Sequence, residues 1–400
     1  MKKGDIIEIT IEQVAFGGDG IGRLDGQVVF VPYTVDGDVV RVEVTDLRKR
    51  YAKGRLTEIL QPSKHRINAL CADYTRCGGC CYQHINYGHQ LFLKETQVRD
   101  AFERIGKISG VPLYPVMPSP EPYHYRLKAD FHIMNQRGKK PIIGLMSGSS
   151  NRIVEITRCE IVDEHINQLL EDCRSSLRNV KRNGSGGRIT LWATDLAKGS
   201  ASKERSSKKT FVKCTVKDLV MMAPYDGFFQ ANQFLVSKMV DQVITAADLH
   251  GRETVIDAYS GSGLFTLFLA PLAGSFYAIE GDPHAIKAAR KNTEQHGLDN
   301  VSFYEGDVAQ VLKRDFASFR KPIDVLLLDP PRTGFGEGLR EQIFRLSPRR
   351  IVYVSCNPAT QARDIQRLIM EEYLLEFLQP IDMFPQTAHI EVIASLNRQN

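Results

Sequence analysis

The sequence predicts an α/β domain in the last part of the chain, preceded by a small β-barrel and a strand-rich middle part. After residue 229, short apolar strands alternate with helical stretches, which is typical of a parallel sheet covered by helices on both faces. Before residue 62, short strands are separated by glycine-containing turns, as in barrels of the OB type. We therefore expect three domains, at residues 1–62, 63–228 and 229–400.

The composition is that of an ordinary globular protein with its positive charge in the first part of the chain. Of the 400 residues, 42% are hydrophobic and 25% are charged, which is usual for globular domains. Residues 1–250 hold 36 Lys and Arg against 28 Asp and Glu, whereas residues 251–400 hold 16 against 19. An excess of cations ahead of the α/β domain is expected where a polyanion binds.

The sequence gives no indication of a membrane segment. No apolar stretch approaches the roughly 20 residues that span a bilayer, and the first residues lack an apolar signal region. We therefore expect a cytoplasmic protein without a membrane partner, and we expect it to be a monomer.

The barrel region carries the strongest cationic cluster. Its clearest strands are expected at residues 6–14, 27–31, 39–44 and 51–60, within a total of five. Arg48, Lys49 and Arg50 precede Tyr51, and Lys53 and Arg55 follow. Cations beside an aromatic ring suit phosphate contacts with base stacking, without readout of sequence. The alternative is a solvated hairpin whose lysines protect a strand edge.

The middle part contains a cysteine cluster, a helix and a strand-rich segment. Apolar residues at helical spacing predict an amphipathic helix over residues 87–107. The segment of about residues 87–115 is a candidate to pack on the α/β domain. A hydrophilic stretch at residues 198–209 is expected to be a mobile loop. Residues 120–228 are otherwise expected to form an α+β domain rich in strands.

A glycine-containing turn follows the first strand of the α/β domain. Asp257 lies near the end of this strand, and Tyr259, Gly261 and Gly263 form the turn before a helix. Glycines allow the backbone to approach a bound nucleotide closely. The third glycine of the dinucleotide fingerprint is absent, and so is a phosphate-binding Gly-Lys-Ser/Thr loop.

Acidic residues follow the next two strands. Glu280 ends the second strand, where a carboxylate can accept both hydroxyls of a ribose. Asp307 follows the third strand and either contacts an adenine or caps a helix. Together with Asp257 near the end of the first strand, this pattern of acidic residues favours S-adenosylmethionine over NAD as the cofactor.

A cysteine and a glutamate mark the other end of the predicted sheet. Cys356 follows the strand at residues 351–354, and Glu391 interrupts a later apolar run. A thiol and a carboxylate beside a nucleotide-binding fold suggest covalent catalysis with a separate base. Asp329 ends an earlier strand in the same manner. Arg332, just beyond it, either binds a phosphate or pairs with a surface acid.

Cys71, Cys77, Cys80 and Cys81 lie within eleven residues, which is unusual in a chain expected to carry no disulfides. Gaps of five and two residues suit zinc or an iron–sulfur cluster, and the spacing alone does not decide between them. Cys81 reads as a spare buried thiol.

These features together resemble the RNA uracil-5-methyltransferase family, most closely its iron–sulfur ribosomal RNA type with an N-terminal TRAM domain. The resemblance covers essentially the whole chain and implies a Rossmann-like S-adenosylmethionine-dependent methyltransferase domain. It implies that a 4Fe-4S cluster is held by Cys71, Cys77, Cys80 and Cys159. The family's Ser-Cys-Asn-Pro motif falls on Cys356 as the nucleophile, and its His-x-Glu signature falls on Glu391 as the base.

The family's cofactor motifs fall on Gln230, Tyr259, Glu280, Asp307 and Asp329. One departure is Leu264, where some members carry Asn, so that one side-chain contact to the cofactor is absent or replaced. The implied substrate is a flipped-out uridine of RNA, with 23S ribosomal RNA as the first choice and transfer RNA as the second. The cluster is expected to organise the middle domain and to perform no redox step.

Two other functions are compatible with parts of the pattern. An N-methyltransferase would use Asp329-Pro330-Pro331 to grip an amine, but Arg332 stands where an aromatic residue is expected and Cys356 would have no role. An RNA-binding protein with a non-catalytic methyltransferase fold would not bind S-adenosylmethionine.

Overall fold

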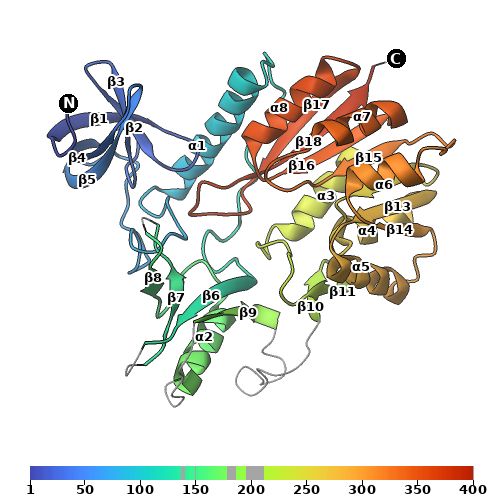
Figure 1. Ribbon diagram of the computed structural model, residues 1–400, viewed down its shortest axis with the longest axis horizontal. Coiled ribbons are helices and arrows are strands. Elements are labelled where there is room, and N and C mark those ends of the chain that lie inside the picture. The colour runs from blue at the N-terminus through green and yellow to red at the C-terminus, as the bar shows by residue number, and fades with distance from the viewer. Residues whose placement is uncertain (137–139, 149, 178–185, 195–210, 400) are drawn as a thin grey trace. The chain divides into compact units, whose positions relative to one another are not determined.

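The computed structural model describes residues 1–400 except 137–139, 149, 178–185, 195–210 and 400 (Figure 1). The hydrophilic stretch at residues 198–209 lies outside the described residues. The chain divides into two units, each of which is discontinuous in sequence. The first comprises Met1–Gln97, Pro120–Ala193 and Phe384–His389, and the second comprises Val98–Ser119, Thr194–Met383 and Ile390–Asn400.

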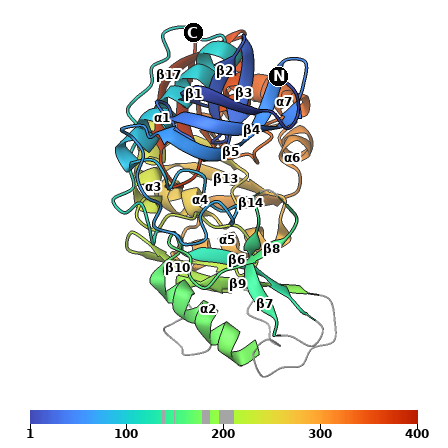
Figure 2. The same cartoon turned by 90° about the vertical axis from the view of Figure 1, so that its left-hand side faces the viewer.

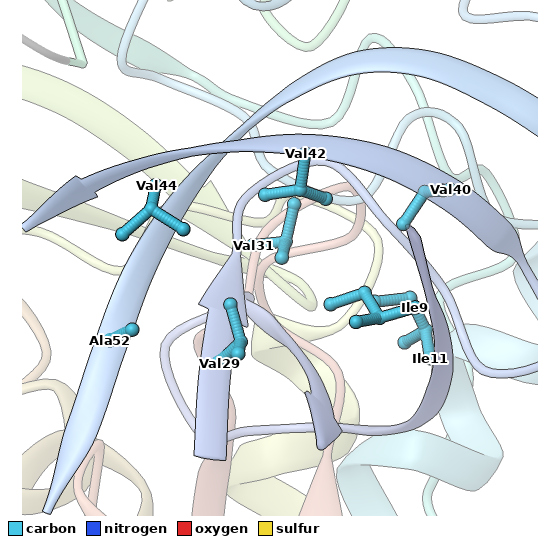
Figure 3. Packing of buried hydrophobic residues seen from close by; sticks show 8 residues of the cluster. All are labelled: Ile9, Ile11, Val29, Val31, Val40, Val42, Val44 and Ala52. Carbon is cyan, nitrogen blue, oxygen red and sulfur yellow. The ribbon is translucent and has the colours of Figure 1, made fainter. Parts of the chain in front are cut away.

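The first five strands close into the barrel that their alternating pattern predicts. The barrel order is β1-β2-β3-β5-β4, with strands β1 (Ile6–Val14), β2 (Gly20–Leu24), β3 (Gln27–Val31), β4 (Val39–Leu47) and β5 (Tyr51–Gln61). Inward-pointing aliphatic side chains fill it, as Figure 3 shows for Ile9, Ile11, Val29, Val31, Val40, Val42, Val44 and Ala52. Because each strand alternates, its outer face is left polar.

A second sheet completes the first unit. Its order is β8-β7-β6-β9, with strands β6 (Lys128–Met134), β7 (Ile142–Met146), β8 (Ile153–Glu155) and β9 (Gly187–Trp192). Helix α2 (Glu164–Leu177) packs against β9 (Figure 2). The helix predicted over residues 87–107 is present as α1 (Tyr87–Asp100), which continues into a short π-helix, η1 (Ala101–Ile105). The prediction that it is amphipathic is wrong, because Gln90 and Lys94 are buried while Phe92 is exposed.

The second unit is built on a seven-stranded sheet, and a small hairpin of β10 (Phe211–Val216) and β11 (Leu219–Pro224) precedes it. The sheet order is β14-β13-β12-β15-β16-β18-β17. Its strands are β12 (Thr254–Ala258), β13 (Ser275–Glu280), β14 (Val301–Glu305), β15 (Val325–Leu328), β16 (Arg350–Ser355), β17 (Tyr373–Ile381) and β18 (Glu391–Arg398). The first five run parallel, whereas β18 pairs antiparallel with both β16 and β17. The strand order reverses at β12, which is where open α/β sheets bind ligands.

Helices cover both faces of this sheet, as the alternation of strands and helices predicts. They are α3 (Val236–Ala247), α4 (Leu264–Leu269), η3 (Ala270–Leu272), α5 (Pro283–Gln295), α6 (Val308–Asp315), α7 (Glu337–Leu346) and α8 (Pro358–Ile369). Contacts join α3 to α4 and α4 to α5, while α6 contacts α7 and α8 packs on β16 and β17. Every residue of β12, β15 and β16 is buried, as expected for strands covered on both sides. Within the part of the chain that the structure describes, no helix is long and apolar enough to cross a membrane.

Candidate active site and cysteine centre

Cys356 and Glu391 lie level with each other at the carboxyl edge of the parallel strands. Cys356 follows the last residue of β16, and Glu391 is the first residue of β18. Ser355 pairs with Val392 across these antiparallel strands, so the next step of the same register sets Cys356 opposite Glu391. Glu391 is only 5% exposed, while Cys356 is partly exposed. A partly exposed thiol and a buried carboxylate therefore share one site.

The charged groups around Cys356 shift the pKa of its thiol in opposite directions. Burial raises the pKa of the Cys356 thiol to about 11, and the negative charges of Glu391 and Asp329 act in the same direction. Arg332 lowers the pKa of this thiol through its charge and a hydrogen bond. Arg332 is thus the local group that favours the reactive thiolate form.

Glu391 has a raised proton affinity for the same kind of reason. Burial raises the pKa of Glu391 well above the ordinary value, and the charge of the nearby Asp329 raises it further, whereas the charge of Arg332 lowers it. A carboxylate with a raised pKa is a stronger base than one in water.

The backbone of Arg332 is fixed against the turn that carries Cys356. Its carbonyl oxygen accepts hydrogen bonds from Asn357 Nδ2 at 3.2 Å and from Thr360 Oγ1 at 3.1 Å. The Asn357 side chain also accepts from the amides of Ala359 and Thr360 and so caps α8. Cys356 precedes this cap, where the amide dipoles of a helix N-terminus favour a thiolate.

The turn after β12 has the strained backbone that a close approach to a ligand requires. Tyr259, Gly261 and Gly263 have φ angles of 67°, 55° and 81°. The Gly261 amide donates to Glu280 Oε2 at 2.8 Å, so the turn and the end of β13 are joined. A Cβ on Gly263 would lie 3.1 Å from the Cβ of Ala289 in α5. Gly263 therefore also allows α5 to pack closely.

Buried polar atoms at the end of β12, in this turn and in Gln230 have no hydrogen-bond partner among the described residues. They are Gln230 Oε1, Asp257 Oδ1, Ser260 Oγ and Ser262 Oγ. Buried polar groups are normally satisfied, so these atoms indicate a polar ligand. Ser260 and Ser262 were not expected as site residues, although their places directly before and after Gly261 were a usable signal.

Two buried carboxyl groups give the same region an affinity for cations. Burial raises the pKa of both Asp257 and Asp329 to about 7, with Glu280 adding to each shift. The hydroxyl of Thr266 donates to Asp257 Oδ2 at 2.6 Å and partly opposes this. A positively charged ligand would relieve the repulsion among these acids.

Asp307 is the N-cap of α6, because its Oδ1 accepts from the Gln310 amide at 3.0 Å. The helix-cap alternative is therefore confirmed. Its charge also raises the pKa of Tyr259, together with burial and the charges of Asp364 and Glu280. Contact with an adenine remains a prediction.

In the first unit, four cysteines line one cavity of 550 Å³: Cys71, Cys77, Cys80 and Cys159. They come from the loop after the barrel and from the loop after β8. Backbone amides fix their positions, since the Cys71 amide donates to Gln83 Oε1 and the Cys159 amide donates to Asn167 Oδ1. Burial raises the pKa of all four thiols. A cationic centre that binds thiolates would offset this cost.

The sulfur spacing bears on which centre fits. Among the described residues, no three of these sulfur atoms lie within 4.8 Å of one another. A single zinc ion with Zn–S bonds of about 2.3 Å holds its sulfurs about 3.8 Å apart. Because thiol side chains can rotate towards an ion, this spacing does not choose between zinc and a 4Fe-4S cluster, both of which four thiolates bind.

Two of the remaining cysteines are buried in the core, and two nearby histidines are held by hydrogen bonds. Cys173 and Cys214 are buried in the core. Histidine side chains near the cysteines make hydrogen bonds, since His84 Nδ1 contacts the Tyr74 hydroxyl at 2.6 Å and His89 Nε2 contacts Asp36 Oδ1 at 2.7 Å.

The cationic cluster lies on the outer face of the barrel. Arg48, Lys49, Arg50 and Lys53 are exposed, and the exposed ring of Tyr51 packs edge-on against Phe30. Arg48 and Arg55 pair with Asp46 and Glu43, respectively. Since these pairs are exposed, they contribute little to stability and leave the cations available.

Known proteins match this chain over its full length. Residues 202–399 match the tRNA (Uracil-5-)-methyltransferase family, and residues 1–57 match the TRAM domain. The chain is 32% identical over 456 residues to an uncharacterized RNA methyltransferase of Halalkalibacterium halodurans, covering 100% of this chain and 98% of that protein. An uncharacterized RNA methyltransferase of Caldanaerobacter subterraneus is also 32% identical, over 451 residues, with 100% and 99% covered.

The fold has a similar solved structure. The Pyrococcus abyssi tRNA (uracil-54, C5)-methyltransferase in complex with S-adenosyl-L-homocysteine has a TM-score of 0.73 and 24% identity, over 98% of this chain and 100% of that chain. This likeness supports the predicted Rossmann-like methyltransferase domain and N-terminal barrel. The two family models and the full-length relatives, by contrast, show that the chain belongs to the RNA uracil-5-methyltransferase family of S-adenosylmethionine-dependent enzymes.

Proposed function

We propose that this protein transfers a methyl group from S-adenosylmethionine to carbon 5 of a uridine in 23S ribosomal RNA through a covalent cysteine–uracil adduct. The observation that carries the proposal is the common position of Cys356 and Glu391 at the carboxyl edge of β16, with Arg332 and Asp329 beside them. A nucleophile and a base are both needed because carbon 5 of uracil is itself a poor nucleophile.

Cys356 performs the first step. Its thiolate adds to carbon 6 of the uracil, and the electron pair of the carbon 5–carbon 6 double bond moves into an enolate. Carbon 5 can then form a bond to the sulfonium methyl group, whose bond to sulfur breaks. Arg332 favours the thiolate and so supports this step.

Glu391 performs the last step. Carbon 5 now carries both the new methyl group and its original hydrogen. Glu391 removes this hydrogen as a proton, the carbon 5–carbon 6 double bond re-forms, and the bond from carbon 6 to the Cys356 sulfur breaks. The raised pKa of Glu391 suits proton abstraction from carbon.

The turn after β12 is proposed to hold the cofactor, which supplies a methyl group on a cationic sulfur. Gln230, Asp257, Ser260 and Ser262 offer unpartnered buried polar atoms. Tyr259, Gly261 and Gly263 would allow close approach, Glu280 would accept the ribose hydroxyls, and Asp307 would reach the adenine. Asp257, Asp329 and Glu280 would attract the positive charges of the cofactor.

Cys71, Cys77, Cys80 and Cys159 are proposed to bind a 4Fe-4S cluster that organises the fold around them. Their common cavity supports this assignment. The barrel at residues 1–62 and the central domain at residues 63–228 are proposed to hold the RNA, while residues 229–400 carry the chemistry. A duplexed uracil cannot present carbon 6 to Cys356, so the target base must be flipped out of its stack.

Transfer RNA is the second candidate substrate. The matching family is named for tRNA, and the similar solved structure acts on uracil 54 of tRNA. The proposal is tested by mapping 5-methyluridine in both RNA classes from cells lacking this protein, and after the purified protein is added back. We expect one or more positions of 23S ribosomal RNA to lose and regain the methyl group. Loss at a tRNA position instead would transfer the proposal to tRNA, and no loss in either class would contradict it.

A further inference from the structure

The loop between β15 and α7, residues 329–336, is held against helix α8 within the second unit. This β15–α7 loop contains Arg332, the cation that bonds to the Cys356 thiol. Arg332 and Thr333 are both exposed, so burial of these two residues does not fix the loop. The contacts of its backbone therefore decide where the Arg332 side chain begins.

Side chains of α8 hold two consecutive carbonyl groups of this loop. Asn357 and Thr360 both donate to the carbonyl oxygen of Arg332. Arg363 donates from Nη2 to the carbonyl oxygen of Thr333 at 3.0 Å. The three donors are spaced three residues apart, and such positions lie on the same side of a helix. One side of α8 thus holds the backbone on which the Arg332 guanidinium is carried.

Asp364, the next residue of α8, holds the loop from inside the protein and is 0% exposed. Its Oδ2 accepts from the amide of Phe335 at 3.0 Å and from the hydroxyl of Tyr353 in β16 at 2.9 Å. Its Oδ1 accepts from Nε and Nη2 of Arg363 at 2.9 Å and 2.6 Å. A buried carboxylate is costly unless it is paired and hydrogen-bonded. Movement of the loop away from α8 would remove one of these donors.

Gly334 shows how closely the loop approaches Asp364. Its φ is 72°, and its amide donates to the carbonyl oxygen of Pro331 at 2.9 Å. A Cβ at this position would overlap with Asp364 Oδ2 and would lie 2.8 Å from Arg363 Nη2. Both the backbone conformation and the contact with α8 therefore require a residue without a side chain.

We propose that Tyr353, Arg363 and Asp364 are positioning residues for the cation of this loop. By holding the loop on α8, they keep the Arg332 guanidinium beside the Cys356 thiol. Cys356 directly precedes the N-cap of the same helix, so α8 supports both the thiol and the cation. If the loop is loosened, the thiolate loses a group that favours it. This inference rests on the proposed role of Cys356 as the nucleophile.

The reactivity of the thiol tests the proposal without RNA, because the thiolate is the form of a cysteine that iodoacetamide alkylates. The rate at Cys356 is followed near pH 7 by mass spectrometry of the peptide that contains it. In Arg363→Met, which replaces a side chain that is 39% exposed, we expect alkylation to slow about three- to tenfold. Arg367→Met removes a cation one turn further along α8 and serves as the control. Its alkylation rate should match that of the parent.

A double variant separates positioning from a direct effect of the Arg363 charge. If Arg363 acts through Arg332, the variant with both Arg332→Met and Arg363→Met should be alkylated within about twofold of Arg332→Met alone. Two glycines of the loop give a matched pair that leaves all charges in place. Gly334→Ala should slow alkylation as Arg363→Met does. Gly336 has a φ of −91°, and an added Cβ meets nothing within 4 Å, so Gly336→Ala should match the parent.

Two results would overturn the proposal. One is alkylation of Cys356 within about twofold of the parent rate in both Arg363→Met and Gly334→Ala. The other is a full additional loss when Arg363→Met is combined with Arg332→Met, since the two residues would then act independently. Failure of the proposed function is distinguishable, because the parent protein would then form no covalent complex with 5-fluorouridine RNA, whereas the alkylation rates need no RNA.

Discussion

At the scale of single residues, the account separates the roles of Cys356 and Glu391 by the order in which they act. Cys356 must form a bond before any methyl group moves, whereas Glu391 is needed only afterwards. The two side chains nevertheless share one electrostatic environment, because Asp329 raises and Arg332 lowers the pKa of each.

Replacement of the base should leave the RNA attached to the protein. In Glu391→Gln the amide cannot accept the proton from carbon 5, so the methylated adduct cannot be eliminated. We expect turnover to fall by about 10² to 10⁴, while a stable covalent complex with RNA containing ordinary uridine appears on denaturing gels. A Glu391→Gln protein that turns over like the parent would assign the base role to another group.

The thiol predicts the pH dependence of adduct formation. Because the pKa of Cys356 is raised to about 11, the thiolate fraction increases tenfold for each pH unit below that value. Trapping of 5-fluorouridine RNA should therefore accelerate from pH 7 to pH 9. Arg332 lowers this pKa, so Arg332→Met should slow trapping about tenfold near neutral pH and recover at higher pH. A flat pH profile would contradict this assignment.

At the scale of elements, the turn after β12 needs glycine for two reasons, its positive φ angles and the close packing of α5. Alanine variants of Gly261 and Gly263 separate these two reasons. Gly261 and Gly263 both have positive φ, but only at Gly263 does an added Cβ meet Ala289, at 3.1 Å. Backbone strain destabilises both alanine variants by about 1 kcal/mol. In Gly263→Ala, helix α5 must in addition move to make room for the new Cβ.

We expect Gly263→Ala to weaken binding of S-adenosylmethionine more than Gly261→Ala does, as measured by calorimetry on the purified proteins. Equal losses would mean that the packing of α5 does not influence the cofactor site.

The sequence predicts most elements because their patterns are local. Alternating aliphatic residues place the barrel strands, and short runs rich in apolar residues place β12, β13 and β14 closely. The insertion of β18 between β16 and β17 is not a local property, since strand order depends on tertiary packing. It is this insertion that brings Glu391 beside Cys356, so the sequence could suggest a thiol with a separate base but not the pairing of the two strands that carry them.

For Lys94, Ser260 and Ser262, the local sequence pattern gave no sign that the side chains are buried. Lys94 reads as a solvent-facing lysine of an amphipathic helix, yet it is fully buried against the carbonyl of Phe384. Ser260 and Ser262 read as turn residues until their unpartnered hydroxyls are seen. In each case the burial depends on segments that are distant in sequence.

At the scale of the whole molecule, the cysteine centre should affect folding more than chemistry. Protein purified without oxygen should contain about four iron and four sulfide per chain. Cys80→Ser should lower the iron content and the stability of the protein, while Cys81→Ser should keep both near the parent values. Stoichiometric zinc in colourless protein would replace the 4Fe-4S assignment.

The central claim is the transient bond between Cys356 and uracil, and covalent trapping tests it most directly. RNA containing 5-fluorouridine is incubated with the protein and S-adenosylmethionine, and the attached nucleotide is located by mass spectrometry. Because fluorine cannot be removed as a cation, the account predicts a stable adduct on Cys356 that carries the transferred methyl group and is absent in Cys356→Ala. Methylation of normal RNA by the parent protein without any such adduct, or with full activity in Cys356→Ala, would contradict it.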